Sequence, residues 1–279
     1  MKSRYILPVL TLLLTLASPI AAQVPTSATG PAKQLSTLVG EKLRYRVSFL
    51  WFSRIALGEI SLQTGDRPGT YLATLRAETK GLAAFFTRDR VETFSTLMEE
   101  GPDGLLRPLV QTSDTRKGRN GDYDTRQTVY TYDFTAHKVG YSKTVNGKRE
   151  MNIEMPMPQD RPVYDFLTAF YNLRLGRFGA VEVGRDIQVT AFSRKGPEKL
   201  VITGIPDDQG RRYGFDKGLS LCRVLLDKDT FKTKGKAVYV GFDRAWRPQR
   251  AVVPDVIGLG DVKGTLFEAI EPGRRRAKP

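Results

Sequence analysis

The sequence predicts a mainly β fold: a large curved antiparallel sheet, open or closed like a barrel, with one central amphipathic helix. Segments that alternate apolar and polar residues recur along the chain, as half-buried strands do. Gly, Pro and Asp separate them, which is typical of turns. Only residues 160–176 have a long helical period. These three observations favour a sandwich or barrel over α/β units.

The first 22 residues predict export. Residues 1–22 have a basic start, an apolar centre and small residues at Ala21-Ala22, the pattern of a cleavable signal peptide. A retained membrane anchor is the alternative, although the apolar run is short for a span. We expect a disordered lead-in at 23–39, a single β-rich domain at 40–270, and a basic disordered tail at 271–279. The expected location is the periplasm.

The first half of the domain predicts eight strands. Two Asn-Gly pairs, at Asn120 and Asn146, predict tight hairpin turns. Gly58 suggests a bulge or a close backbone approach, and residues 81–86 form either a helical turn or an apolar loop. The expected strands are 42–49, 55–62, 71–78, 90–99, 107–117, 123–134, 137–145 and 148–155.

The helix is expected over residues 160–176, after which the strands resume. Asp160 is a candidate N-cap, Pro162 suits the first turn, and Gly176 suits the C-terminal stop. One apolar stripe comprises Val163, Phe166, Leu167, Phe170 and Tyr171. Six strands are expected after it, at 186–193, 199–205, 220–227, 236–242, 248–254 and 260–269.

The residue types argue against familiar catalytic chemistry. The chain has one His, His137, and one Cys, Cys222, so a zinc site of the usual ligands and an intramolecular disulfide are both excluded within one chain. Neither a nucleophile elbow nor a phosphate-binding loop is present. We expect no cofactor, no metal and no enzymatic activity. A carboxylate pair, Asp165 with Glu41 or Glu59, is the remaining catalytic alternative, and Cys222 is expected to be a buried apolar residue rather than a reactive thiol.

Two sets of residues are candidates for binding. Aromatic side chains could line a cavity for a lipid or another apolar ligand, or simply pack in the core: Trp51, Phe52, Phe85, Phe86, Phe166 and Phe170. The formal charge of +14 becomes +12 when the leader, with two cations and no acid, is removed. The excess favours an anionic envelope polymer, lipid or protein over nucleic acid, or serves solubility alone. The basic-surface candidates are Arg116, Lys117, Arg119, Lys148, Arg149, Arg211 and Arg212.

Several motifs resemble the exported bacterial family called domain of unknown function 3108. The most specific is Asp165-Phe166-Leu167-Thr168-Ala169-Phe170-Tyr171-x-Leu173-Arg174, with Gly40-Glu41-x-Leu43-x-Tyr45 before it and Trp246-x-Pro248 after it. The resemblance covers about residues 40–270. It implies a periplasmic protein with a large curved antiparallel sheet, and it carries over no catalytic residues. Its motif residues here are Glu41, Tyr45, Asp165, Tyr171, Arg174 and Trp246.

The expected function is therefore non-catalytic binding of a hydrophobic or amphipathic cell-envelope component between the sheet and the helix. An assembly or scaffold role, in which the basic hairpins dock a protein or polyanion, is the alternative. A carboxylate-based hydrolase is the third possibility.

Overall fold

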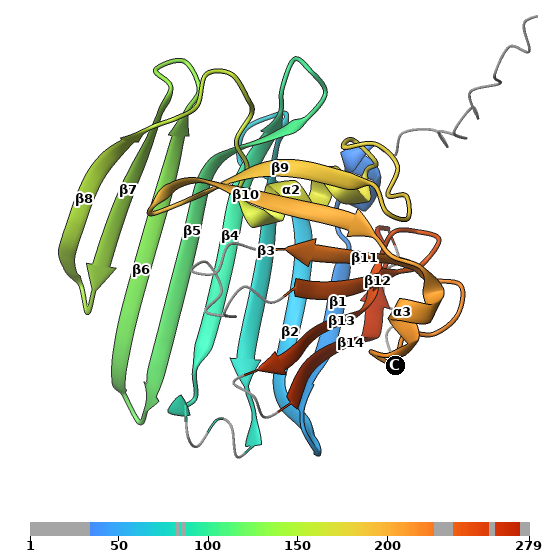
Figure 1. Ribbon diagram of the computed structural model, residues 1–279. Helices are drawn as coiled ribbons and strands as arrows, with labels where there is room; N and C mark the ends of the chain where they lie inside the picture. The colour runs from blue at the N-terminus through green and yellow to red at the C-terminus, as the bar shows by residue number, and fades with distance from the viewer. Residues whose placement is uncertain (1–33, 82–83, 85–86, 226–236, 257–259, 274–279) are drawn as a thin grey trace, which may run out of the picture. The chain divides into compact units, whose positions relative to one another are not determined.

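A computed structural model describes residues 34–81, 84, 87–225, 237–256 and 260–273, which belong to one compact unit, 31–279 (Figure 1). Its dominant element is a sheet of fourteen strands. The strands are β1 (Lys42–Phe49), β2 (Phe52–Thr64), β3 (Thr70–Thr79), β4 (Val91–Glu100), β5 (Leu106–Arg119), β6 (Asp122–Asp133), β7 (Lys138–Val145), β8 (Lys148–Pro156), β9 (Asp186–Ser193), β10 (Gly196–Gly204), β11 (Ser220–Leu225), β12 (Ala237–Phe242), β13 (Pro248–Val256) and β14 (Gly260–Ile270).

The order of the strands shows how the two halves of the chain meet. From one edge to the other it is β8-β7-β6-β5-β4-β3-β2-β1-β14-β13-β12-β11-β10-β9, and the neighbouring strands are antiparallel. Consecutive hairpins build each half, and the long-range pairing of β1 with β14 joins them. The edge strands β8 and β9 are not paired with each other, so the sheet is open. The predicted fold class is confirmed.

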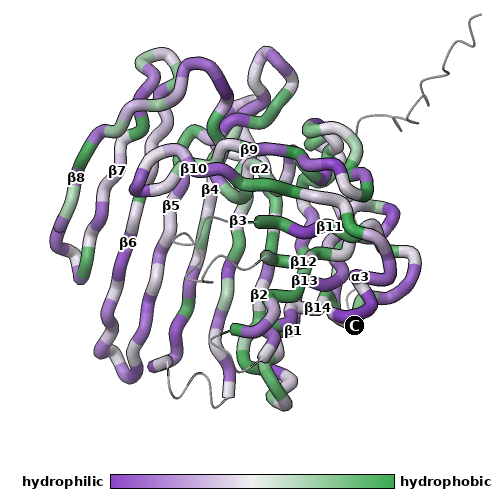
Figure 2. The backbone as a smooth tube through the Cα atoms, in the orientation of Figure 1, coloured by the Kyte–Doolittle hydropathy of each residue, from purple (hydrophilic) through white to green (hydrophobic). Residues whose placement is uncertain are grey.

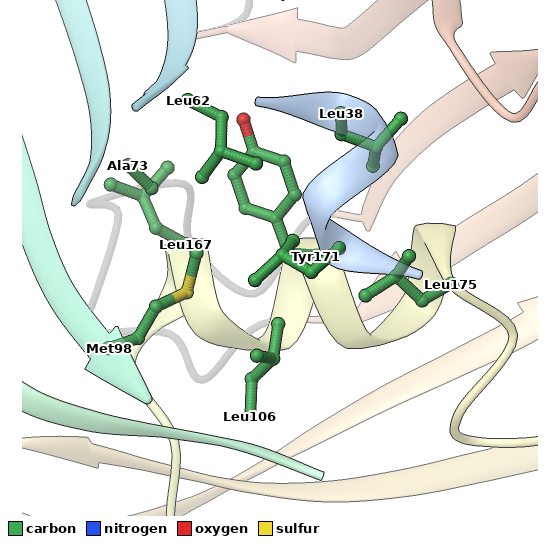
Figure 3. Packing of buried hydrophobic residues seen from close by; sticks show 9 residues of the cluster. Leu38, Leu62, Ala73, Met98, Leu106, Leu167, Tyr171 and Leu175 are labelled. Atoms are coloured by element: carbon green, nitrogen blue, oxygen red, sulfur yellow. The ribbon is translucent and has the colours of Figure 1, made fainter. Parts of the chain in front are cut away.

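Helix α2 (Phe166–Arg174) occupies the inner face of this sheet. Its residues Leu167 and Tyr171 are fully buried against Leu62, Ala73 and Met98, which come from β2, β3 and β4 (Figure 3). The other side of the helix contributes Ala169 and Leu173 to a second cluster with β9–β12. The helix is thus packed on both halves of the sheet, because its apolar residues extend around much of its circumference.

The sheet bends around this helix. Tyr164, just before α2, forms an isolated parallel bridge with Ala191 of β9. Phe192 of β9 lies edge-on to Tyr132 of β6, with ring centroids 6.4 Å apart. Strands separated by most of the sheet order therefore lie close in space on the α2 side. In Figure 1, β9 and β10 cross in front of α2 and the β3–β5 region.

The structure corrects the predicted start of the helix. Asp165, not Asp160, is the N-cap, and its carboxylate accepts the Thr168 N–H at 2.7 Å. Residues 160–165 are not helical, because the Tyr164 backbone bonds to β9 instead. The predicted stop is confirmed. Gly176 has φ +71, and the N–H groups of Gly176 and Arg177 bond to the carbonyls of Leu173 and Asn172, a Schellman motif.

Other short elements depart from the sequence-based expectation. Part of the expected disordered lead-in forms the 3-10 helix η1 (Leu35–Leu38), because Leu35 and Leu38 are buried against the α2 cluster. A short helix, α3 (Asp207–Arg211), lies between β10 and β11, where no helix was expected. Gly58 marks no bulge, since its pairing with Tyr45 is regular. In the described part of the chain, no helix has the length and apolarity needed to cross a membrane. The expected signal peptide lies outside the described residues.

Candidate functional site

Of the six residues that carry the predicted resemblance, five lie around the C-terminal end of α2: Glu41, Tyr45, Tyr171, Arg174 and Trp246. Arg174 is 2% exposed, and its guanidinium forms a two-point ion pair with Glu41, with Nη1–Oε2 and Nη2–Oε1 distances of 2.5 and 3.0 Å. Its Nε donates to the Trp246 carbonyl at 2.8 Å. Because a planar guanidinium presents donors on two edges, one side chain ties α2 to both halves of the sheet.

The surroundings of this ion pair favour a structural role. The guanidinium lies over the rings of Phe170 and Tyr171, 5.5 and 5.7 Å from their centroids. Burial raises the pKa of Tyr171 and of the neighbouring Tyr45, whose hydroxyl donates to the Pro248 carbonyl at 3.0 Å. The hydrogen bonds of Arg174 direct its guanidinium at protein atoms, so they hold α2, β1 and β13 together.

The motif residue Asp165 lies at the other end of the helix. It is buried, caps α2 and accepts a hydrogen bond from the Thr96 hydroxyl of β4. Burial raises the pKa of the Asp165 carboxyl, and the bonds from Thr168 and Thr96 oppose that rise. Nine residues of helix separate it from Arg174 and Glu41, about 13 Å.

A third contact, between Asn172 of α2 and the start of β5, was not predicted from the sequence. The buried Asn172 side chain accepts the Leu106 N–H at 2.9 Å and donates to the Leu106 carbonyl at 3.0 Å. It therefore serves both backbone groups at the start of β5. The only available sequence signal was a polar residue between apolar positions of a helix, which most often indicates a solvent-facing position.

The carboxylates considered for catalysis do not converge. Glu41 binds Arg174, Asp165 is at the opposite end of α2, and Glu59 is paired with Arg44 on the outer face at 2.7 Å. The described residues also contain no cluster of three potential metal ligands. Cys222 is buried, as expected, and burial raises the pKa of its thiol to about 12.

The aromatic candidates are dispersed through the fold. Phe166 and Phe170 pack in the clusters around α2, with Phe166 edge-on to Phe94 of β4. Trp51 and Phe52 lie at the β1–β2 turn, at the far end of β1 from Glu41, roughly 25 Å away. Phe85 and Phe86 lie outside the described residues. The structure does not bring the described four into one pocket.

The inner face of the sheet has a second row of residues next to the row that contacts α2. The strand register places Tyr45, Gly58, Ala77 and Glu92 in one row across β1–β4, next to the row of Leu43, Ile60, Leu75 and Phe94 that supports the helix. Gly58 and Ala77 make the middle of this second row small. A Cβ placed on Gly58 would have only ordinary contacts, at 3.8 Å from Tyr45 Cβ and 3.9 Å from the Arg76 carbonyl oxygen.

This row continues from apolar to charged residues. Beyond Ala77, the register adds Glu92, Thr115 and Arg126 on β4, β5 and β6. Glu92 accepts hydrogen bonds from Arg90 and Thr115. Figure 2 shows β5 and β6 as mainly hydrophilic along their length, with more hydrophobic positions in β2 and β3. A surface that is apolar over β2 and β3 and polar over β4–β6 suits an amphipathic molecule.

The basic candidates fall in two regions. Arg116, Lys117, Arg119, Lys148 and Arg149 lie near the β5–β6 and β7–β8 turns, which are adjacent because Asn146 and Thr125 bond through both backbone and side chain. Arg211 and Arg212 instead lie at the end of α3, where Arg212 borders a hollow of about 370 Å³ with Tyr213 and Tyr239.

A second hollow, of about 500 Å³, lies over β3–β7 and is polar. Its lining includes Arg76, Thr93, Arg116 and Gln127. The register puts these residues on the face opposite the α2 contacts. The same lining includes Thr115 and Arg126, two residues of the row that runs from Tyr45 across the inner face.

Comparisons with known proteins give the fold a neighbour of unknown function. No protein-family model matches the chain, and no curated protein matches it either. The resemblance to domain of unknown function 3108 thus stays a prediction. A solved structure, a β-barrel-like protein of domain of unknown function DUF1849 from Brucella abortus, is 13% identical over 85% of this chain and 99% of that one, with a TM-score of 0.45.

Proposed function

We propose that the chain is a non-catalytic exported protein that binds a hydrophobic or amphipathic component of the cell envelope on the inner face of its sheet. The observation that carries the proposal is the row below α2. There Gly58 and Ala77 provide small, half-buried positions next to the row of Ile60, Leu75 and Phe94 that packs against α2. Because the edge strands β8 and β9 are not paired, a ligand could reach the inner face between them.

The chemistry of the row indicates the class of ligand. Val47, Tyr45 and Phe94 are half-buried beside the small residues and would contact an acyl chain or another apolar body. Arg126 and Lys117, on the neighbouring strands, are exposed cations that suit an anionic head group. The chain's excess of positive charge is consistent with this polarity.

Native mass spectrometry tests the proposal on protein purified without detergent after export. We expect a copurifying lipid or amphiphile that is released on unfolding. Ala77→Leu places bulk on the inner face and should reduce its occupancy. Thr125→Leu adds a similar side chain to an exposed position on the outer face of β6 and serves as the control. Protein without bound amphiphile, or equal occupancy in Ala77→Leu and wild type, would contradict the proposal.

A further inference from the structure

The turn between β1 and β2 exposes three consecutive apolar side chains. Leu50, Trp51 and Phe52 are 41%, 80% and 39% exposed. The Trp51 and Phe52 rings are in contact, with centroids 5.6 Å apart, so they form one small apolar surface. Figure 2 shows this turn as hydrophobic, whereas the β5–β6 turn at the same end of the sheet is hydrophilic. Trp51 contributes nothing to the core.

The backbone of this turn adds a second observation. Leu50 has φ +54, a left-handed conformation in which Gly or Asn is preferred. The β5–β6 and β7–β8 turns follow that preference with Asn120 and Asn146. Leu50 reaches over Gly260, where an added Cβ would lie 2.7 Å from Leu50 Cδ2. The chain thus keeps apolar residues at a turn where folding alone favours polar or small ones, which points to function.

The turn shares its end of the sheet with basic hairpins. Antiparallel register places the β1–β2, β5–β6 and β7–β8 turns at the end opposite α2. Exposed cations at this end are Arg54, Arg116, Lys117, Lys148 and Arg149. Among the described residues none of these five has an acidic partner, although Arg116 covers the ring of Tyr123 at 4.8 Å.

Most acidic side chains at this end form ion pairs with cations other than those five. Asp122 and Asp124 pair with Arg88, and Asp89 pairs with Arg119. Glu150 pairs with Lys143. The five cations named above therefore leave a net positive charge at this end of the sheet.

We propose that this end of the sheet docks on the surface of an anionic lipid bilayer, with Trp51 and Phe52 entering the head-group region. Tryptophan favours that region because its apolar indole ring carries a polar N–H, and the adjacent Phe52 ring adds apolar area. Nearby Lys and Arg side chains strengthen binding to anionic lipid. Three apolar side chains are too few for a stable protein–protein interface, which covers about 800 Å² per partner, whereas shallow insertion needs only a small tip.

The docking does not depend on a ligand at the inner face. It concerns the opposite end of β1 from α2, and it can be measured with lipid vesicles alone. Loss of copurifying amphiphile would leave it intact, and loss of vesicle binding would leave the inner-face proposal intact.

Vesicle cosedimentation tests the docking, using the chain from Gln23 onward, which keeps the compact unit 31–279 and omits the apolar leader. Vesicles of phosphatidylglycerol with phosphatidylethanolamine are compared with neutral phosphatidylcholine. We expect binding to the anionic vesicles, weakened about tenfold or more by Trp51→Ser and about fivefold by Arg54→Gln. Val183→Ser, at a residue 66% exposed between α2 and β9, and Arg149→Lys, which keeps the charge, are the controls and should bind like wild type.

Fluorescence gives an independent readout of insertion. The chain has two tryptophans, Trp51 and Trp246. Emission from the wild type should move to shorter wavelength on anionic vesicles, and Trp51→Phe should remove that change while preserving binding. Equal binding by wild type and Trp51→Ser, equal binding to neutral and anionic vesicles, or unchanged Trp51 emission would overturn the proposal. So would a Trp51-dependent dimer in gel filtration without vesicle binding.

Discussion

Arg174 and Glu41 form a buried two-point ion pair between the end of α2 and the entrance of β1, across 133 residues of sequence. The same guanidinium holds the Trp246 carbonyl just before β13. Since β1 and β13 flank β14 at the centre of the sheet, this one side chain fixes α2 at the junction of the two halves.

Removing one partner of this pair should be costly. Arg174→Met leaves the Glu41 carboxylate buried and the Trp246 carbonyl without its donor, and we expect unfolding free energy to fall by about 3–5 kcal/mol. Denaturant titration provides the measurement. Arg44→Gln, which removes partly exposed pairs with Glu59 and Glu268, should cost about 0–1 kcal/mol. A double variant, Arg174→Met with Glu41→Leu, should recover part of the loss; equal losses for Arg174→Met and Arg44→Gln would contradict the assignment.

Asp165 should tolerate loss of charge better than loss of its oxygen. Asp165→Ala removes the N-cap and the Thr96 partner and should cost about 2 kcal/mol. Asp165→Asn retains a capping oxygen and should cost less. Burial raises the pKa of the Asp165 carboxyl above its unfolded value of 3.8. The wild type should therefore lose stability relative to Asp165→Asn as the pH rises from that value through the raised pKa of the folded state. Parallel pH dependences in the two proteins would refute this account.

The buried thiol of Cys222 should make the fold sensitive to alkali. Its pKa rises from 9.0 to about 12 on burial, so the unfolded chain loses its proton first. The stabilising contribution is complete below pH 9 and declines up to about pH 12, with a slope of about 1.4 kcal/mol per pH unit. Urea titrations between pH 8 and 10, where tyrosine ionisation contributes least, should show a shallower decline in Cys222→Ala. If the unfolding free energy of Cys222→Ala declined with pH as steeply as that of the wild type, the thiol would not be the cause of the alkaline destabilisation.

Two glycines offer a contrasting test of the hairpins. Gly118 has φ +143, and a Cβ there would overlap the Asp122 carbonyl oxygen of the partner strand. Gly118→Ala should therefore destabilise the protein by at least about 1–3 kcal/mol. Gly264 on β14 has no heavy atom within 4 Å of a Cβ position, so Gly264→Ala should be neutral or mildly stabilising. Thermal melts of both variants make the comparison, and a neutral Gly118→Ala would contradict the observed turn.

Much of the fold was predictable because strand alternation is a local property. Residues such as Leu43, Tyr45 and Val47 alternate with Lys42, Arg44 and Arg46 wherever one face of a strand is buried, and the other strands follow the same rule. The Gly176 stop was also local, since a left-handed position one residue past a helix selects Gly. The true start of α2 was not, because Tyr164 is held by β9, which comes later in the chain.

The sequence by itself determined fourteen strands, one main helix and a strong positive charge, since each is carried by neighbouring residues or by composition. Only the tertiary structure decided that the sheet stays open, that Arg174 meets Glu41, and that Trp51 lies exposed at the same end of the sheet as two basic hairpins. Those outcomes depend on which strands pair and which charges are buried together. They are set by contacts between residues far apart in the chain, on which local periodicity carries no information.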